Sequence, residues 1–120
     1  MTGDKILSGA LAHTLRKFAD ERDWDVFHTP KNIATAISVE SAELLELFQW
    51  SRGSAGWHEL ANAELRKKVE EELADILLYI IRFADLADID LQKSAEEKIV
   101  KNGLKYPVDR FKGNDKKYNE

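Results

Sequence analysis

Four acidic residues lie where a packed helix is expected to be apolar. Glu40 and Glu43 form one pair, and Glu72 and Asp75 form a second, with a spacing of three residues in each. At about 100° per residue, the first pair interrupts an apolar helical stripe made of Ile33, Ile37, Leu44 and Leu47. The second pair interrupts a stripe made of Leu65, Val69, Ile76 and Tyr79. Because buried carboxylates without partners are costly, this pattern predicts a compensating cation.

The chemistry of the four carboxylates favours a hard divalent metal. Residues three apart are neighbours on a helix, so two such helices packed face to face would form a cage of carboxylate oxygens. Oxygen ligands suit Mg²⁺, whose usual task beside carboxylates is to hold substrate phosphates. The simplest alternative is a set of solvated surface charges, but the alignment of both pairs with apolar stripes favours the metal site. A di-iron bundle would add Glu-x-x-His motifs, and no glutamate precedes His13, His28 or His58 by three residues.

A basic helical face is predicted further along the chain. Spacings of three, four and seven residues place four side chains on one side of a helix, namely Lys98, Lys101, Asn102 and Lys105. The ammonium groups could hold a polyphosphate as point charges, and the asparagine could add a hydrogen bond. The alternative is a solvated basic face that complements the carboxyl end of the helix. A metal site in the same protein favours the phosphate interpretation.

Several aromatic residues are placed where they could contact a planar nucleobase. Trp24 and Phe27 lie in a predicted connector, Trp50 lies near a predicted helix end, and Tyr79 lies one turn beyond Asp75. Aromatic side chains are more often core residues than ligand platforms. Tryptophan in a connector or at a helix end is nevertheless well placed to stack on a base.

Composition limits the size and class of the protein. A chain of 120 residues with 43% hydrophobic residues can form one domain with one core. Its net charge of -4 argues against a general nucleic-acid-binding surface, so a polyanionic substrate would require a metal. The lack of cysteine excludes disulfides and cysteine-ligated zinc. No apolar run has the length of a membrane span and the first residues do not resemble a signal peptide, so we expect a cytoplasmic protein.

Hydrophobic periodicity is helical along most of the chain and predicts an all-α bundle of about four helices. The expected helices cover residues 5–22, 32–50, 60–87 and 90–103. A connector at 23–31 contains Pro30, which disfavours helix at the preceding residue, and a small polar loop follows at 51–56. Asp90 is a predicted N-cap, and Gly103 followed by Pro107 predicts the end of the last helix. We assign residues 1–112 to a single domain and 113–120 to a polar, disordered tail.

Two of the predicted helices carry large apolar surfaces. The first is expected to pack through a face made of Ile6, Ala10, Leu11, Leu15 and Phe18. The second half of the helix at 60–87 is apolar on almost every side, which a small monomer cannot bury. We therefore expect the protein to form an oligomer.

The acidic pairs and the residues around them resemble a known family. Glu40-x-x-Glu43 followed by Glu72-x-x-Asp75 is similar to the metal signature of the all-α nucleoside triphosphate pyrophosphohydrolases, the MazG-like superfamily. Four segments, spread over about residues 10–110, resemble its dCTP pyrophosphatase branch: ERDWDVFHTPKN, ESAELLELFQW, EELADILLYI and KNGLKYPV. The resemblance implies a homotetramer of helical protomers and Mg²⁺-dependent hydrolysis of a nucleoside triphosphate to a monophosphate and pyrophosphate. It also implies a role in nucleotide-pool control.

The same resemblance implies roles for individual residues. The catalytic metal ligands would be Glu40, Glu43, Glu72 and Asp75. The nucleotide would contact Trp24, Asp25, Val26, Phe27, His28, Trp50, Tyr79, Lys98, Asn102 and Lys105. Where these enzymes have a histidine in the base pocket, this chain has Leu15, and His13 points about 200° away from that position. We therefore expect a preference for dCTP-like pyrimidine deoxynucleotides that is looser than in the rest of the family.

The sequence thus predicts a metal-dependent pyrophosphohydrolase that acts on a small nucleotide rather than on a nucleic acid polymer or a membrane. A water molecule would attack phosphorus, and Glu40, deepest in its stripe, is the expected base. The alternative is a non-catalytic helical oligomerisation module in which the acidic cluster binds a structural cation. Magnesium-dependent release of pyrophosphate would separate the two interpretations.

Overall fold

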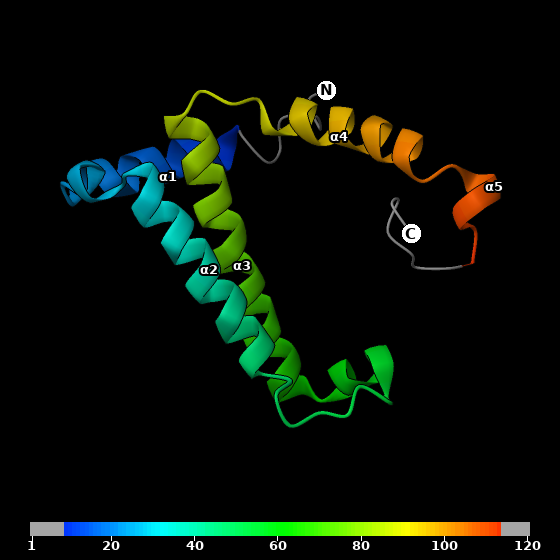
Figure 1. Cartoon of the computed structure of the whole chain (residues 1–120). Coiled ribbons are helices and arrows are strands. Elements are labelled where there is room, and N and C mark those ends of the chain that lie inside the picture. Colours follow the sequence, from blue (N-terminus) through cyan, green and yellow to red (C-terminus); the bar gives the residue numbers. More distant parts are fainter. Residues whose placement is uncertain (1–8, 114–120) are drawn as a thin grey trace.

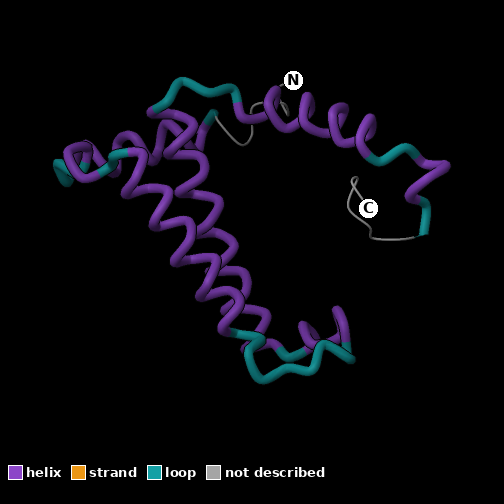
Figure 2. The backbone as a smooth tube through the Cα atoms, in the orientation of Figure 1, coloured by secondary structure: helices purple, strands orange, loops and turns teal. Residues whose placement is uncertain are grey.

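The computed structural model describes residues 9–113. Within this range the chain consists of helices joined by turns and loops, without a strand, as the all-α prediction requires (Figure 2). The elements are α1 (Ala10–Glu21), η2 (Asp25–Phe27), α2 (Pro30–Glu46), η3 (Gly56–Ala61), α3 (Ala63–Leu86), α4 (Leu91–Lys105) and α5 (Val108–Phe111). The predicted tail at 113–120 lies, apart from Gly113, outside the described residues. The same holds for residues 5–8 of the first predicted helix.

The centre of the fold is a long antiparallel pair of helices, α2 and α3, which lie side by side in Figure 1. α1 packs against α3 near the end from which the chain continues to α4. The buried apolar core comes from these three helices and contains Ala12, Ala19, Ile33, Val69, Ile81 and Ala84. No helix in residues 9–113 is long and apolar enough to cross a membrane.

The face through which α1 packs differs from the prediction. Ala12 and Ala19 are buried and Leu15 is half-buried, whereas Leu11 and Phe18 are 37% and 44% exposed. The buried positions have helical spacing, but the most buried residues are alanines. Small side chains allow two helices to approach closely, so α1 contacts α3 through a narrower stripe than its large apolar residues indicate.

Side-chain caps define where three of the helices begin. The Thr29 hydroxyl accepts a hydrogen bond from the Asn32 amide at 3.2 Å, and Pro30 occupies the first turn, so α2 starts two residues before its predicted start. Asn62 caps α3 in the same way and separates it from η3. Asp90 caps α4, as predicted. At its other end α2 stops at Glu46, four residues early, because residues 47–50 form turns instead.

Two helices end in a Schellman motif with an aspartate, rather than a glycine, in the left-handed conformation. Asp23 follows α1 with φ of 54°, and the Trp24 amide donates to the Ala19 carbonyl at 3.0 Å. Asp88 follows α3 with φ of 56°, and Ile89 makes the equivalent bond at 2.8 Å. The first of these turns fixes the position of Trp24 directly after α1.

The last helices lie away from the central pair. α4 extends from the end of α3 and does not run alongside α2 and α3, and α5 follows at its far end (Figure 1). Gly103 does not end α4, which continues to Lys105 before Pro107. Three apolar residues of this part of α4, Ile99, Val100 and Leu104, are between 66% and 79% exposed. The expected bundle of about four helices is therefore not closed within the described part of one chain.

Candidate active site

Three of the four predicted carboxylates converge between α2 and α3. Glu40, Glu43 and Glu72 each offer an oxygen, and these oxygens all lie within 4.8 Å of one another. Glu40 and Glu72 are half-buried and Glu43 is exposed. The antiparallel pairing of α2 with α3 brings them together, because residues 32 positions apart in the sequence face each other across the helix pair. The cluster is therefore open to solvent on the side of Glu43.

The carboxylates of this cluster lack compensating partners among the described residues. The Oε2 atoms of Glu40 and Glu72 are buried and have no hydrogen-bond partner in this part of the chain. A proton shared mainly with Glu72, and then with Glu43, raises the pKa of Glu40 to about 7. Burial and the negative charges of Glu43 and Asp75 act in the same direction. The cluster thus retains negative charge that a cation would neutralise.

The donor set fits a divalent cation that prefers oxygen. Every ligand in the cluster is a carboxylate, and two buried oxygens are unpartnered. No histidine or cysteine belongs to it within residues 9–113, so the set does not fit a zinc or di-iron centre. The predicted fourth ligand, Asp75, lies outside the group of three and lines the neighbouring pocket. Its charge still acts on Glu40.

An aromatic pocket of about 170 Å³ adjoins the cluster through Asp75. Its walls come from α1, from the segment after α1 and from α3, and consist of Leu15, Phe18, Trp24, His28, Asp75, Leu78, Tyr79 and Arg82. The rings of Phe18 and Trp24 meet edge to face, with centroids 5.6 Å apart. Three predicted nucleoside contacts, Trp24, His28 and Tyr79, are thus brought together. Leu15, which replaces the histidine of the related enzymes, also lines this pocket.

Arg82 is the charged pocket residue that the sequence does not predict. It is only 3% exposed, and its Nη2 donates to Asp25 at 2.7 Å while its Nε donates to His28 at 3.0 Å. Its one signal in the sequence is an arginine within the otherwise apolar run YIIRFA. The partners of Arg82 lie more than 50 residues earlier in the chain. Only the fold reveals them.

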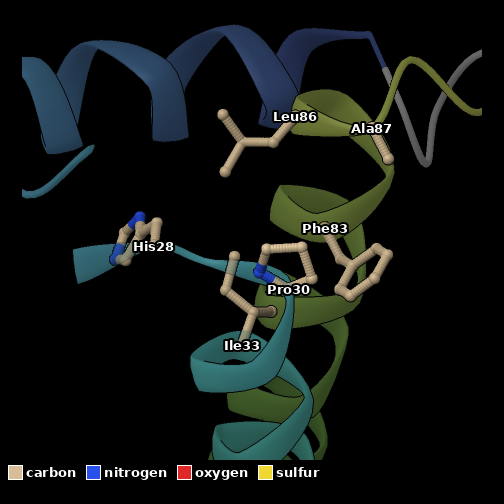
Figure 3. A pocket seen from close by; sticks show the side chains of 6 residues that line it. All are labelled: His28, Pro30, Ile33, Phe83, Leu86 and Ala87. Carbon is tan, nitrogen blue, oxygen red and sulfur yellow. The ribbon is translucent and has the colours of Figure 1, made fainter. Parts of the chain in front are cut away.

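A second pocket, of about 280 Å³, also has His28 in its wall. Figure 3 shows its walls, which come from the turn before α2, the start of α2 and the end of α3. They consist of His28, Pro30, Ile33, Phe83, Leu86 and Ala87. His28 is the one titratable residue among them. None of its lining residues belongs to the acidic cluster, and none carries a carboxylate, so this pocket is not part of the candidate site.

The other predicted contacts do not reach the pocket within one chain. Val26 and Phe27, which lie in η2, are 75% and 64% exposed and do not line it. Trp50 is 89% exposed. It lies after the last residue of α2, whereas Trp24 lies before the first, so these two tryptophans do not enclose one base in a single chain. The polar residues of the basic face, Lys98, Lys101, Asn102 and Lys105, lie on α4, away from α2 and α3 (Figure 1).

Comparisons with known proteins agree with this arrangement. Residues 35–120 match the MazG-like family. The dCTP pyrophosphatase 1 of Rattus norvegicus is 36% identical over 104 residues, and that of Homo sapiens is 37% identical over 108. Each match covers 87% of this chain but only 61% of the relative, so the chain spans about three fifths of the length of these relatives.

A solved structure has the same fold. The crystal structure of a pyrophosphatase from Archaeoglobus fulgidus superimposes with a TM-score of 0.75 and 45% sequence identity. The match covers 81% of this chain and 89% of that chain. With a family match over most of its length, and a solved relative that shares its helical arrangement, this chain belongs to the MazG-like family.

Proposed function

We propose that this protein hydrolyses a nucleoside triphosphate to the monophosphate and pyrophosphate, with a dCTP-like pyrimidine deoxynucleotide favoured. The observation that carries the proposal is the adjacency of the acidic cluster to the aromatic pocket, with Asp75 between them. Such a site offers ligands for a phosphate-bound cation next to a surface that suits a base. The names of the relatives, dCTP pyrophosphatase and pyrophosphatase, support the same reaction class.

The residues have distinct proposed roles. Glu40, Glu43 and Glu72 would hold Mg²⁺, with Asp75 completing the set from the pocket side. When bound, Mg²⁺ would neutralise negative charge on the phosphates and make phosphorus easier to attack. Glu40, which lies in the centre of its stripe, is the proposed acceptor of the proton from the attacking water. Trp24 and Tyr79 would hold the base and so orient the triphosphate toward the cluster.

We also propose that the protein works as a homotetramer. Large apolar side chains remain exposed on the central pair and on α4, including Leu45, Leu73 and Leu104. Trp50 and the basic face of α4 lack contact with the pocket of their own chain, and in an assembly they could contribute to the pocket of a neighbouring protomer. Light scattering at micromolar concentration tests the assembly, and a stable monomer would contradict it.

The test of the reaction is pyrophosphate release from a panel of canonical and modified nucleoside triphosphates, with and without Mg²⁺. We expect Mg²⁺-dependent turnover with dCTP among the best substrates, because a pyrimidine fits the small pocket. Glu43→Gln and Asp75→Asn should abolish turnover without loss of helical content. Glu46→Gln, an exposed glutamate at the end of α2, is the matched control and should remain active.

Different results distinguish the alternatives. Near-normal turnover in both Glu43→Gln and Asp75→Asn would contradict the assigned metal site. No turnover of any triphosphate, together with thermal stabilisation by Mg²⁺, would favour the helical module with a structural cation. Much higher kcat/KM for purine triphosphates than for dCTP would remove the base preference and leave the reaction class standing.

A further inference from the structure

Arg82 is a buried charge in a helix that has little reason to contain one. Its neighbours in α3, Ile81 and Phe83, are apolar, and its own side chain is almost fully buried. Its Nη1 has no hydrogen-bond partner among the described residues. An apolar side chain of similar size would usually serve stability at least as well as a buried ion pair. The arginine is therefore better explained by what its contacts hold in place.

Both partners of Arg82 belong to the short segment that directly follows the pocket tryptophan. Asp25 and His28 delimit this segment, which follows Trp24 and contains η2. Trp24 and His28 meet edge to face, with ring centroids 6.1 Å apart. Two charge-assisted hydrogen bonds from one rigid guanidinium fork thus tie the segment to α3, the helix that carries Asp75 and Tyr79.

The bond to His28 also determines which ring nitrogen carries a proton. The Nε of arginine can only donate, so Nδ1 of His28 must be the acceptor. The neutral imidazole then has its proton on Nε2, and the ring lines the pocket as a single tautomer. Burial, and then the charge of Arg82, lower the pKa of His28, in agreement with a neutral ring.

We propose that Arg82 is a positioning residue of the nucleoside pocket, which fixes His28 as the Nε2–H tautomer and anchors segment 25–28 so that Trp24 forms the pocket wall. The proposal rests on the proposed function for its assignment of the pocket to the nucleoside. It goes beyond that function because Arg82 lies outside the acidic cluster and acts through two other side chains. Its removal should therefore affect substrate binding rather than metal binding.

The first test is a nitrogen-15 NMR measurement of the histidine tautomers in the nucleotide-free wild-type protein. We expect the His28 signal of the pure Nε2–H form, and a pure Nδ1–H form would overturn the proposal. In Arg82→Met the restraint is lost, so a mixture of tautomers is expected. The signal of His58, which lies at the other end of the helix pair, should not change. Because this measurement needs no activity, it holds even if no triphosphate is turned over.

The second test is a steady-state comparison with dCTP and Mg²⁺. Arg82→Met should raise KM by about tenfold and change kcat by less than about twofold, and the Mg²⁺ dependence should stay as in the wild type. Arg82→Lys should not restore KM, because one ammonium cannot reproduce the two directed bonds. Arg66→Met removes an exposed arginine from the same helix and is the matched control.

Further variants distinguish a role of Arg82 in positioning the pocket from a role in the stability of the whole fold. If Arg82→Met does not fold, Asp25→Asn weakens one of the two bonds at an exposed residue and should raise KM by a smaller factor. A loss confined to kcat, or an unchanged KM in folded variants, would overturn the proposal. Absence of wild-type turnover together with the expected tautomer would instead count against the proposed function and leave the role of Arg82 in place.

Discussion

Magnesium binding is expected to compete with a proton on Glu40. In the metal-free protein the neighbouring carboxyl groups, Glu72 first, raise the pKa of Glu40 to about 7. With this pKa, Glu40 is about nine-tenths protonated at pH 6 and about one-tenth protonated at pH 8. A cation that requires the ionised carboxylate must displace the proton. The apparent affinity for Mg²⁺ should therefore rise by about tenfold from pH 6 to pH 8.

Isothermal titration calorimetry in two buffers of different ionisation enthalpy measures both the affinity and the protons released. The wild-type protein should release about 0.9 proton per site at pH 6 and about 0.1 at pH 8. Glu40→Gln carries no such proton, so its weaker binding should not change over this range. Glu71→Gln, an exposed neighbour of Glu72, is the control and should behave like the wild type. Proton release that persisted in Glu40→Gln would refute the reasoning.

The same pKa predicts an opposite effect on the stability of the metal-free protein. The folded pKa of Glu40 lies above its ordinary value of 4.5, so the folded state holds the proton more tightly than the unfolded state. The free energy of unfolding should fall as the pH rises from about 4.5 to about 7, and remain lower above that. Glu40→Gln should therefore raise the melting temperature at pH 8 in the presence of a chelator. A lower melting temperature of Glu40→Gln than of the wild type at pH 8 would show that the neighbouring carboxylates do not repel the ionised Glu40.

Two further predictions concern the helix ends and the contact between α1 and α3. Asp88→Gly should increase the free energy of unfolding by about 0.5–1 kcal/mol in urea denaturation, because glycine adopts the left-handed conformation without steric cost, and Asp88→Ala should decrease it. Arg16 binds Asp85 through two hydrogen bonds of 2.9 Å, which are the main reason that the pKa of Asp85 is lowered. Asp85→Asn should therefore lower the melting temperature at pH 7. The difference from the wild type should shrink as the pH falls below the ordinary aspartate pKa of 3.8, because the unfolded state then binds a proton that the folded carboxylate, with its lowered pKa, binds less readily. A difference that stayed constant down to pH 3 would contradict the assigned role of this pair.

The central helix pair and its acidic cluster could be predicted because they depend on local periodicity. The spacing of Ile33, Ile37 and Leu44 fixes one face of α2, and the spacing of Val69 and Ile76 fixes one face of α3. Two amphipathic helices that follow one another along the chain, here joined by residues 47–62, bury these faces against each other. The glutamates within the stripes therefore had to meet. The cap at Asp90 could be predicted for the same reason, because its side chain binds an amide only three residues further along the chain.

Other features depend on contacts that periodicity does not encode. Arg82 meets Asp25 and His28 only because the turn after α1 returns the chain to α3. That turn uses Asp23 in a conformation that usually indicates glycine, so its sequence signal is weak. Gly103 is a glycine that does not end a helix, although the sequence predicts a helix end there. It lies inside α4 and does not adopt the left-handed conformation. The separation of α4 from the central pair is likewise a tertiary property.

One face of α3 fixes the spacing between the acidic cluster and the aromatic pocket, because it carries Glu72, Asp75, Tyr79 and Arg82. One continuous helix sets the distance between the acidic cluster and the pocket, at about 1.5 Å per residue, and holds all four side chains within about one quarter of its circumference. Insertion or deletion of one residue between Asp75 and Tyr79 would rotate the pocket by about 100° relative to the carboxylates. This stretch can therefore diverge by substitution but not by a change in length. Selectivity can evolve in the side chains around the pocket while the spacing between pocket and cluster stays constant.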